Sequence, residues 1–76
     1  MITVKLFGLL RLESGIREKQ LEAATVKEVL QQLHEAGISK KDLGGCVIFV
    51  NGESASKRKK LTDGDLVVLM PPVAGG

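Results

Sequence analysis

The feature that most constrains the fold is an uninterrupted apolar segment, LVVLM at Leu66–Met70, followed directly by Pro71 and Pro72. A strand without polar residues normally lies at the centre of a sheet or is buried on both faces. Proline has no backbone N–H to donate to a neighbouring strand, so the sheet pairing should end near Met70. The sequence therefore predicts a central strand near its C-terminal end and a short segment that leaves the sheet.

The composition predicts one small folded domain. With 76 residues the chain is near the lower size limit for a self-sufficient hydrophobic core, and its 43% apolar content argues against disorder. The net charge of +2 is too small to indicate nucleic-acid binding. No segment approaches the ~18 apolar residues of a membrane span. A single cysteine cannot form an internal disulfide, which favours a reducing compartment. We expect a cytoplasmic domain that binds neither nucleic acid nor membranes.

The N-terminal part of the chain predicts a β-hairpin. Along ITVKLF the side chains alternate between two faces, with Ile2, Val4 and Leu6 on one and Thr3, Lys5 and Phe7 on the other. This period of two is typical of a half-buried strand. The ESG sequence at Glu13–Gly15 is a turn signal. We expect the following IREKQL, residues 16–21, to form a weaker second strand.

The clearest local signal predicts a helix over residues 26–36. Thr25 and Glu28 have the spacing of a capping box, in which each side chain satisfies a free backbone N–H at the helix start. Apolar residues then recur at helical spacing along one face: Val26, Val29, Leu30, Leu33 and Ala36. Gly37 supplies the C-terminal stop.

The remaining segments complete an α+β order. They are a connection (38–45), a strand CVIFV (46–50), an Asn51-Gly52 turn, a short edge strand (53–56), a basic loop and an LTDGD turn (61–65) before the last strand. This order fits a β-grasp, or ubiquitin-like, roll: a mixed sheet of four or five strands with one main helix packed on one face. The first and last strands would be parallel and adjacent at the centre. We assign residues 1–70 to this domain and residues 71–76 to an extended tail.

Few side chains are suited to catalysis, and no metal-binding or cofactor-binding motif is present in the sequence. His34, the only histidine, is interpreted as a surface or boundary residue of the helix. Cys46 lies within an apolar run and is expected to pack as a small hydrophobe, with a redox or sulfur-transfer thiol as the alternative. As an enzyme in its own right the chain is poorly equipped.

One charge run, KRKK at Lys57–Lys60, is interpreted as a solvated loop. No aromatic residues are interleaved with it, which argues against the stacking that single-stranded nucleic acids require. The last strand carries the chain about 16 Å from the loop at ~3.3 Å per residue, so the loop and the tail should lie at opposite ends of the domain. Docking onto an acidic partner is the functional alternative.

The tail, Pro71–Gly76, has a shape that packing alone does not require. Two prolines favour polyproline II geometry, a stiff exit of ~3.1 Å per residue. Gly75 and Gly76 make the tip narrow and leave a terminal carboxylate unhindered. Such a tip suits insertion into a narrow channel of another protein and attack by the carboxylate on a nucleotide phosphate. A frayed terminus is the alternative interpretation.

The segment LTDGDLVVLMPPVAGG, Leu61–Gly76, resembles the C-terminus of the MoaD/ThiS sulfur-carrier family. FGLLRLESG is similar to the first hairpin of that family through Phe7, Arg11 and Gly15, and the VNG at residues 50–52 also fits. The similarity spans nearly the whole chain, and its specificity is concentrated in the last sixteen residues. Leu69-Met70 departs from the aromatic residues that many small molybdopterin synthase subunits carry before the two prolines.

The resemblance implies a carrier whose Gly76 is adenylated by an E1-like, ATP-using enzyme and converted to a thiocarboxylate. Gly75 would keep the tip narrow. Two sets of residues follow from the same resemblance: Pro71, Pro72, Val73 and Ala74 for tail insertion, and Phe7, Arg11, Leu69 and Met70 for partner docking. No metal or resident cofactor is implied, because ATP is consumed by the activating partner.

The molybdopterin branch of the family is the nearest match. It implies the small subunit of molybdopterin synthase, which inserts its tail into the large subunit, in a heterotetramer, and gives sulfur to the pterin precursor. Other carriers remain open, for tungsten-pterin synthesis, tRNA thiolation or thiamine synthesis, although thiamine-pathway carriers usually lack the Pro-Pro-Val segment. A ubiquitin-like protein modifier and a β-grasp binding module with an incidental tail are further alternatives.

Overall fold

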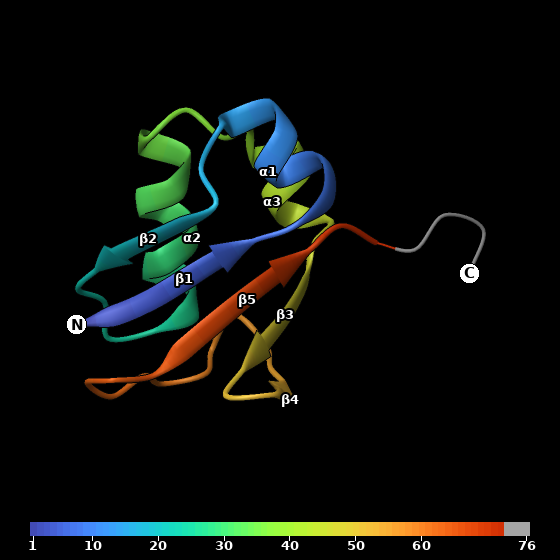
Figure 1. Ribbon diagram of the computed structural model, residues 1–76. Coiled ribbons are helices and arrows are strands. Elements are labelled where there is room, and N and C mark those ends of the chain that lie inside the picture. The colour runs from blue at the N-terminus through green and yellow to red at the C-terminus, as the bar shows by residue number, and fades with distance from the viewer. Residues whose placement is uncertain (73–76) are drawn as a thin grey trace.

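The computed structural model describes residues 1–72 and is built around β5 (Leu66–Met70) (Figure 1). The five strands have the order β2-β1-β5-β3-β4, so β5 is central, as predicted. It pairs in parallel with β1 (Ile2–Leu6) and antiparallel with β3 (Val47–Val50). The outer strands are β2 (Glu18–Leu21) and β4 (Glu53–Ser54), each antiparallel to its neighbour. The predicted mixed β-grasp sheet, with the first and last strands side by side, is confirmed.

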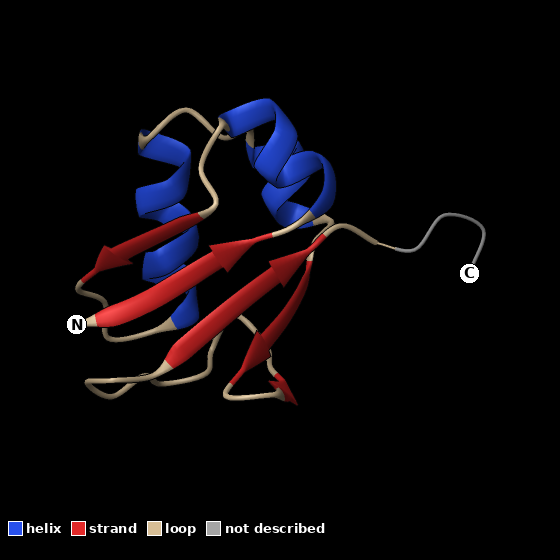
Figure 2. Ribbon diagram, in the orientation of Figure 1, coloured by secondary structure: helices blue, strands red, loops and turns tan. Residues whose placement is uncertain are grey.

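The sheet has one covered and one open face, and the helices lie on the covered face (Figure 2). Ile2, Val4 and Leu6 of β1 are buried, which confirms the alternation predicted there. β5 also alternates, although its sequence does not: Val67 and Leu69 are completely buried, whereas Met70 is exposed. The apolar run is therefore explained by its central position and not by burial on both faces.

The main helix, α2 (Val26–Glu35), begins as the capping signal predicts. The Glu28 N–H donates to Thr25 Oγ1 at 3.3 Å, and the Ala24 N–H donates to Glu28 Oε2 at 3.2 Å. The predicted apolar face is confirmed in its first four members, Val26, Val29, Leu30 and Leu33, which are all buried. Ala36 is exposed, because the helix ends at Glu35 and the chain turns away at the C-cap.

Two further helices differ from the sequence-based prediction. α1 (Gly8–Ser14) lies between the two predicted strands of the hairpin and runs into the predicted Glu13–Gly15 turn, and α3 (Lys40–Gly44) lies in the segment interpreted as a plain connection. Only Leu10 of α1 is buried, so the helix has no apolar stripe for a periodicity argument to detect. α3 is short but capped, because Ser39 Oγ accepts from the Asp42 N–H at 3.1 Å.

The core consists of aliphatic side chains. Sixteen residues form one buried cluster, all of them Leu, Ile or Val, and none of the buried residues in 1–72 is polar or charged. Neither phenylalanine is in the cluster. Cys46 is half-buried against it, as predicted, but lies one residue before β3 and not within it. The Cys46 thiol donates to the Leu43 carbonyl oxygen at 2.9 Å.

Side-chain hydrogen bonds fix the beginning of β5. Asn51 donates from Nδ2 to Asp65 Oδ1 at 2.9 Å, and its Oδ1 accepts from the Leu66 N–H at 2.9 Å. Asp65 Oδ2 also accepts from the Thr62 N–H at 2.9 Å. The backbone hydrogen bond from Thr62 and the amide of Asn51 lower the pKa of Asp65 below its ordinary value. Asn51 adopts a left-handed conformation with φ 51°, which confirms the turn predicted there.

The basic loop Lys57–Lys60 is held against the first turn of α2. The Val26 and Lys27 N–H groups donate to the carbonyl oxygens of Lys59 and Lys57, each at 3.0 Å. The chain leaves β5 at Met70, beside α1, and Figure 1 shows this exit at a different end of the molecule. The loop and the exit therefore lie apart, as predicted.

Candidate functional site

The chain leaves the sheet at Pro71, next to the start of α1. The Phe7 N–H donates to the Leu69 carbonyl oxygen at 3.1 Å, which extends the pairing of β1 with β5 to its end. Pro71 is half-buried and lies directly over Gly8. Gly8 has a φ of +61°, and a Cβ built on it would be 2.5 Å from Cγ of Pro71. The contact between Gly8 and Pro71 thus defines the direction in which the chain departs.

The elements around this exit expose most of the large apolar side chains of the described residues. Five of the six such residues belong to them: Phe7, Leu9, Leu12, Val47 and Met70. Leu12 is 77% exposed and Leu9 is 61% exposed, both on α1, while Val47 is the register partner of Met70. We call these five residues the tail-base surface. Large apolar side chains exposed around one point of a small domain are a candidate interaction site.

The predicted docking residues divide into three groups. Phe7 and Met70 belong to the tail-base surface and are available to a partner. Arg11 is half-buried on α1, where its carbonyl oxygen accepts from the Gly15 N–H at 2.9 Å. Leu69 is completely buried in the core, so the docking role predicted for its side chain is wrong. In an apolar strand the sequence did not reveal which residues face outward.

The structure adds two residues that the sequence-based prediction missed. Leu9 and Leu12 lie exposed on α1, a helix that was not predicted, and neither was assigned a role. The sequence GLLRL contains three leucines, and a seven-residue helix cannot bury all of them. This was the signal that could have indicated exposed leucines. Of the predicted tail-insertion residues, Pro71 and Pro72 are described and Pro72 is exposed. Val73, Ala74, Gly75 and Gly76 lie outside the described residues.

The titratable groups provide no conventional catalytic arrangement within residues 1–72. Burial raises the pKa of the Cys46 thiol, which disfavours the nucleophilic thiolate. The exposed side chain of His34 directs Nδ1 to the Ile38 carbonyl oxygen at 2.8 Å, at the C-terminal end of α2. The hydrogen bond that a protonated Glu13 carboxyl donates to the Asp42 carboxylate, together with the negative charge of Asp42, raises the pKa of Glu13. No group of three His, Cys, Asp or Glu residues in this part of the chain is placed to hold a metal ion.

The fold and the exit of the chain at Pro71 indicate a class of protein. A β-grasp sheet whose central strand leads directly into a C-terminal segment, with exposed apolar residues around the exit, is the architecture of ubiquitin-like proteins. The chain belongs to the ThiS family, whose model matches residues 4–76, and this is a family of ubiquitin-like sulfur carriers. The match includes the segment that follows β5.

Solved structures with the same fold support this assignment. Subunit 1 in the complex of subunits 1 and 2 of molybdopterin-converting factor from Helicobacter pylori is similar, with 32% identity, a TM-score of 0.75 and coverage of 99% of this chain and 97% of that one. The small archaeal modifier protein 1 of Methanosarcina acetivorans has 28% identity and a TM-score of 0.81, with coverage of 99% and 95%.

A third similar structure is the BexX/CysO complex of Amycolatopsis orientalis, with 26% identity, a TM-score of 0.76 and full coverage of both chains. Two of these three neighbours were therefore solved in complexes with a partner protein. A search of curated protein sequences gives no match. No helix within residues 1–72 has both the length and the apolar character needed to span a bilayer.

Proposed function

We propose that the chain carries sulfur as a thiocarboxylate on Gly76, as the small subunit of molybdopterin synthase. The observation that carries this proposal is the match to the sulfur-carrier family, which continues through the tail to residue 76. The tail-base surface supports it, because a carrier must be held by each enzyme that charges or discharges its tail. The absence of a catalytic side-chain arrangement within residues 1–72 is compatible with this role, since the reacting group is a main-chain carboxylate.

The proposed chemistry takes place in two steps. A carboxylate oxygen of Gly76 attacks the α-phosphate of ATP on an E1-like activating enzyme, which forms an acyl adenylate and releases pyrophosphate. A sulfide equivalent from the sulfur donor then attacks the acyl carbon, and AMP leaves with the electron pair of the breaking C–O bond. The chain itself would contribute two terminal residues without side chains, Gly75 and Gly76, and two prolines that favour an extended segment before them.

The molybdopterin branch is favoured by the similarity to subunit 1 of the Helicobacter pylori molybdopterin-converting factor. That protein was solved in complex with subunit 2, and we propose an equivalent large subunit as the partner of this chain. In this scheme the tail enters the large subunit, within a heterotetramer in the cytoplasm, and the thiocarboxylate gives its sulfur to the pterin precursor. The identity of the sulfur acceptor is the most specific claim of the proposal and needs its own test.

A second candidate, a protein modifier, is favoured by the similarity to small archaeal modifier protein 1. The same acyl adenylate would then react with a lysine amine of another protein in place of sulfur. The two functions share the activation step and differ in the nucleophile. They are therefore distinguished by the product formed after activation.

The test is intact-mass analysis after incubation with an E1-like enzyme, ATP and a sulfur donor. We expect the full-length chain to exchange one oxygen for sulfur and a chain lacking Gly75 and Gly76 to remain unchanged. A full-length chain that stays a carboxylate contradicts the carrier function. Transfer of the sulfur to a pterin precursor by the added large subunit supports the molybdopterin branch, whereas isopeptide-linked Gly-Gly remnants on cellular proteins support the modifier.

A further inference from the structure

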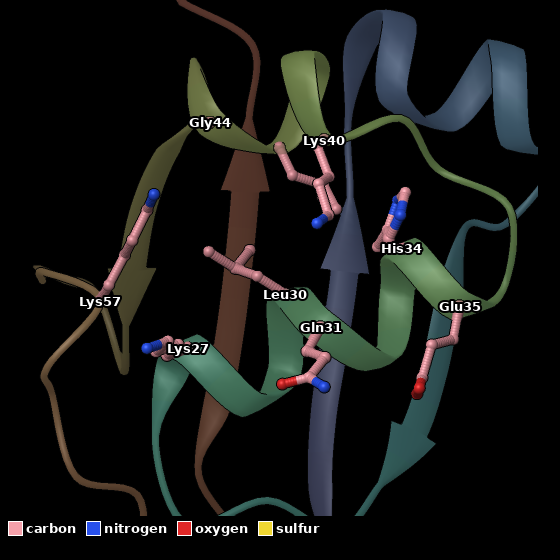
Figure 3. A pocket seen from close by; sticks show the side chains of 9 residues that line it. Lys27, Leu30, Gln31, His34, Glu35, Lys40, Gly44 and Lys57 are labelled. Carbon is pink, nitrogen blue, oxygen red and sulfur yellow. The ribbon is translucent and has the colours of Figure 1, made fainter.

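A groove lies on the helical side of the molecule, between α2, α3 and the loop that contains Lys57 (Figure 3). Its volume is about 600 Å³, and it shares no lining residue with the tail-base surface. Leu30 and Leu43 are among its lining residues and belong to the hydrophobic core. The groove therefore combines two apolar lining residues with several long polar ones, and the proposed sulfur chemistry does not use it.

Three lysines from three separate segments line this groove. Lys27 comes from the first turn of α2, Lys40 from α3 and Lys57 from the basic loop. In Figure 3 their ammonium groups surround the side chain of Leu30. The backbone hydrogen bond from the Lys27 N–H to the Lys57 carbonyl oxygen, at 3.0 Å, fixes two of the three segments relative to each other. The cluster is thus set by the fold and not by a run in the sequence.

These charges are not neutralised within the described part of the chain. The ion pairs among residues 1–72 join the Met1 ammonium to Asp63 and Lys5 to Glu18, so Lys27, Lys40 and Lys57 pair with no carboxylate there. Glu35 is the one acidic residue that lines the groove, and Figure 3 shows it at the far side from Lys57. Three lysines without a carboxylate partner along one groove make this face basic, which favours an anionic partner.

We propose that the groove binds an acidic amphipathic helix of a partner protein. Apolar side chains on one turn of that helix would lie over Leu30 and Leu43, and carboxylates on either side would reach the three lysines. Such pairing of an apolar helix face with a groove is a recurring recognition mode, and the charges would set partner choice and association rate. A partner bound in this way leaves the tail-base surface and the tail accessible.

Other occupants fit the groove less well. The lining residues include no Phe, Tyr or Trp on which nucleic-acid bases could stack. A membrane surface is broad and cannot enter a concave groove between two helices. A second copy of this chain would bring a molecule of net charge +2 against a basic face. Charge complementarity therefore favours an acidic protein segment.

The experiment uses two synthetic helical peptides and the isotope-labelled full-length chain. One peptide carries leucines at positions i, i+3 and i+7 flanked by glutamates, and the other has glutamine in place of every glutamate. We expect the acidic peptide to shift backbone amide resonances of α2, α3 and Lys57, and to bind more weakly as the salt concentration rises. Shifts confined to the tail-base surface or to the open face of the sheet, or no shifts at all, overturn the proposal.

A matched pair of triple variants distinguishes binding in the groove from a general effect of the positive charge of the chain. Lys27→Ala with Lys40→Ala and Lys57→Ala should weaken acidic-peptide binding at least about tenfold, or ~1.4 kcal/mol. The control, Arg17→Ala with Lys19→Ala and Lys60→Ala, removes the same charge from exposed positions outside the groove and should change the affinity by less than about threefold.

Three results would overturn the proposal: equal losses in the two triple variants, equal affinity for the glutamine peptide, and equally tight binding of an oligonucleotide or of phosphatidylserine vesicles. The variants should retain sulfur charging of the tail in the intact-mass assay. Failure of the groove is thereby distinguished from failure of the proposed function.

Discussion

The two ends of β5 are built in opposite ways. At Leu66 the strand begins in a network of hydrogen bonds at the surface, in which the Asn51 side chain binds both the Asp65 carboxylate and the Leu66 N–H. At Met70 it ends among exposed apolar side chains, and its last backbone contact leads into the Gly8–Pro71 contact. The first end holds the strand in register without any partner. The end at Met70 leaves apolar side chains uncovered, as is typical of a surface that binds another protein.

The largest effect is expected at Leu69, in contrast to its neighbour Met70. Leu69→Ala removes a completely buried leucine and should lower the free energy of unfolding by about 2–5 kcal/mol. Met70→Ala, one residue later and 41% exposed, should lower it by less than ~1 kcal/mol. Chemical denaturation measures both values. Similar losses in the two variants would mean that the open and covered faces are not distinct.

The next effect concerns docking without a change in stability. Leu12→Ser combined with Met70→Ser should weaken binding to the activating enzyme or to a large subunit by about 2 kcal/mol, as expected for central apolar contacts. The melting temperature should hardly change, because both side chains are exposed. Calorimetric titration provides the affinity, and Lys19→Ala on β2 is the control. Unaltered affinity in the double variant would remove the tail-base surface from the docking site.

An effect of similar size, on stability and not on docking, is expected at the polar end of β5. Asn51→Ala removes two side-chain hydrogen bonds and places at φ 51° a residue that adopts the left-handed conformation less readily than asparagine does. The free energy of unfolding should therefore fall by about 2 kcal/mol. Asn51→Gly keeps the left-handed turn accessible and should lose less. If the alanine and glycine variants unfold at the same denaturant concentration, backbone conformation does not contribute at this position.

The smallest effect is a dependence on pH. The folded-state pKa of Asp65 is lowered, so the ionised carboxylate stabilises the fold above the unfolded value of ~3.9, and this contribution is lost as the pH falls through the folded pKa. Asp65→Asn should therefore be less stable than the parent at neutral pH, and the two should converge in acid. Thermal unfolding across this range is the measurement, with Glu53→Gln as the control. Parallel pH curves for parent and Asp65→Asn would contradict the assignment.

The sequence predicted the segments whose local signals agree with the tertiary structure. α2 has a capping residue, a period of 3.6 and a glycine stop, and its four buried residues were all assigned to the apolar face. β1 was correctly given one buried face because its pattern alternates. The central place of β5 followed from its composition. In each case a local preference and the global fold favour the same answer.

The candidate site was predicted less well, for a physical reason. The N-cap of α1 is Phe7, whose side chain makes no capping hydrogen bond, and the helix buries only Leu10. Leu9 and Leu12 were missed because exposed apolar side chains do not follow the pattern of a monomeric core. The error at Leu69 has the same origin, because an all-apolar strand does not indicate which side chains face a partner.

The central position of β5 also affects how the chain is synthesised. β5 is the last strand made, yet it lies between β1 and β3, so neither half of the sheet can join the other until it is complete. Until then the inner edges of β1 and β3 remain open, and such edges are prone to wrong pairing. Contacts between residues so distant in sequence also slow folding. On the ribosome, the sheet of this domain therefore stays incomplete until β5 has been translated.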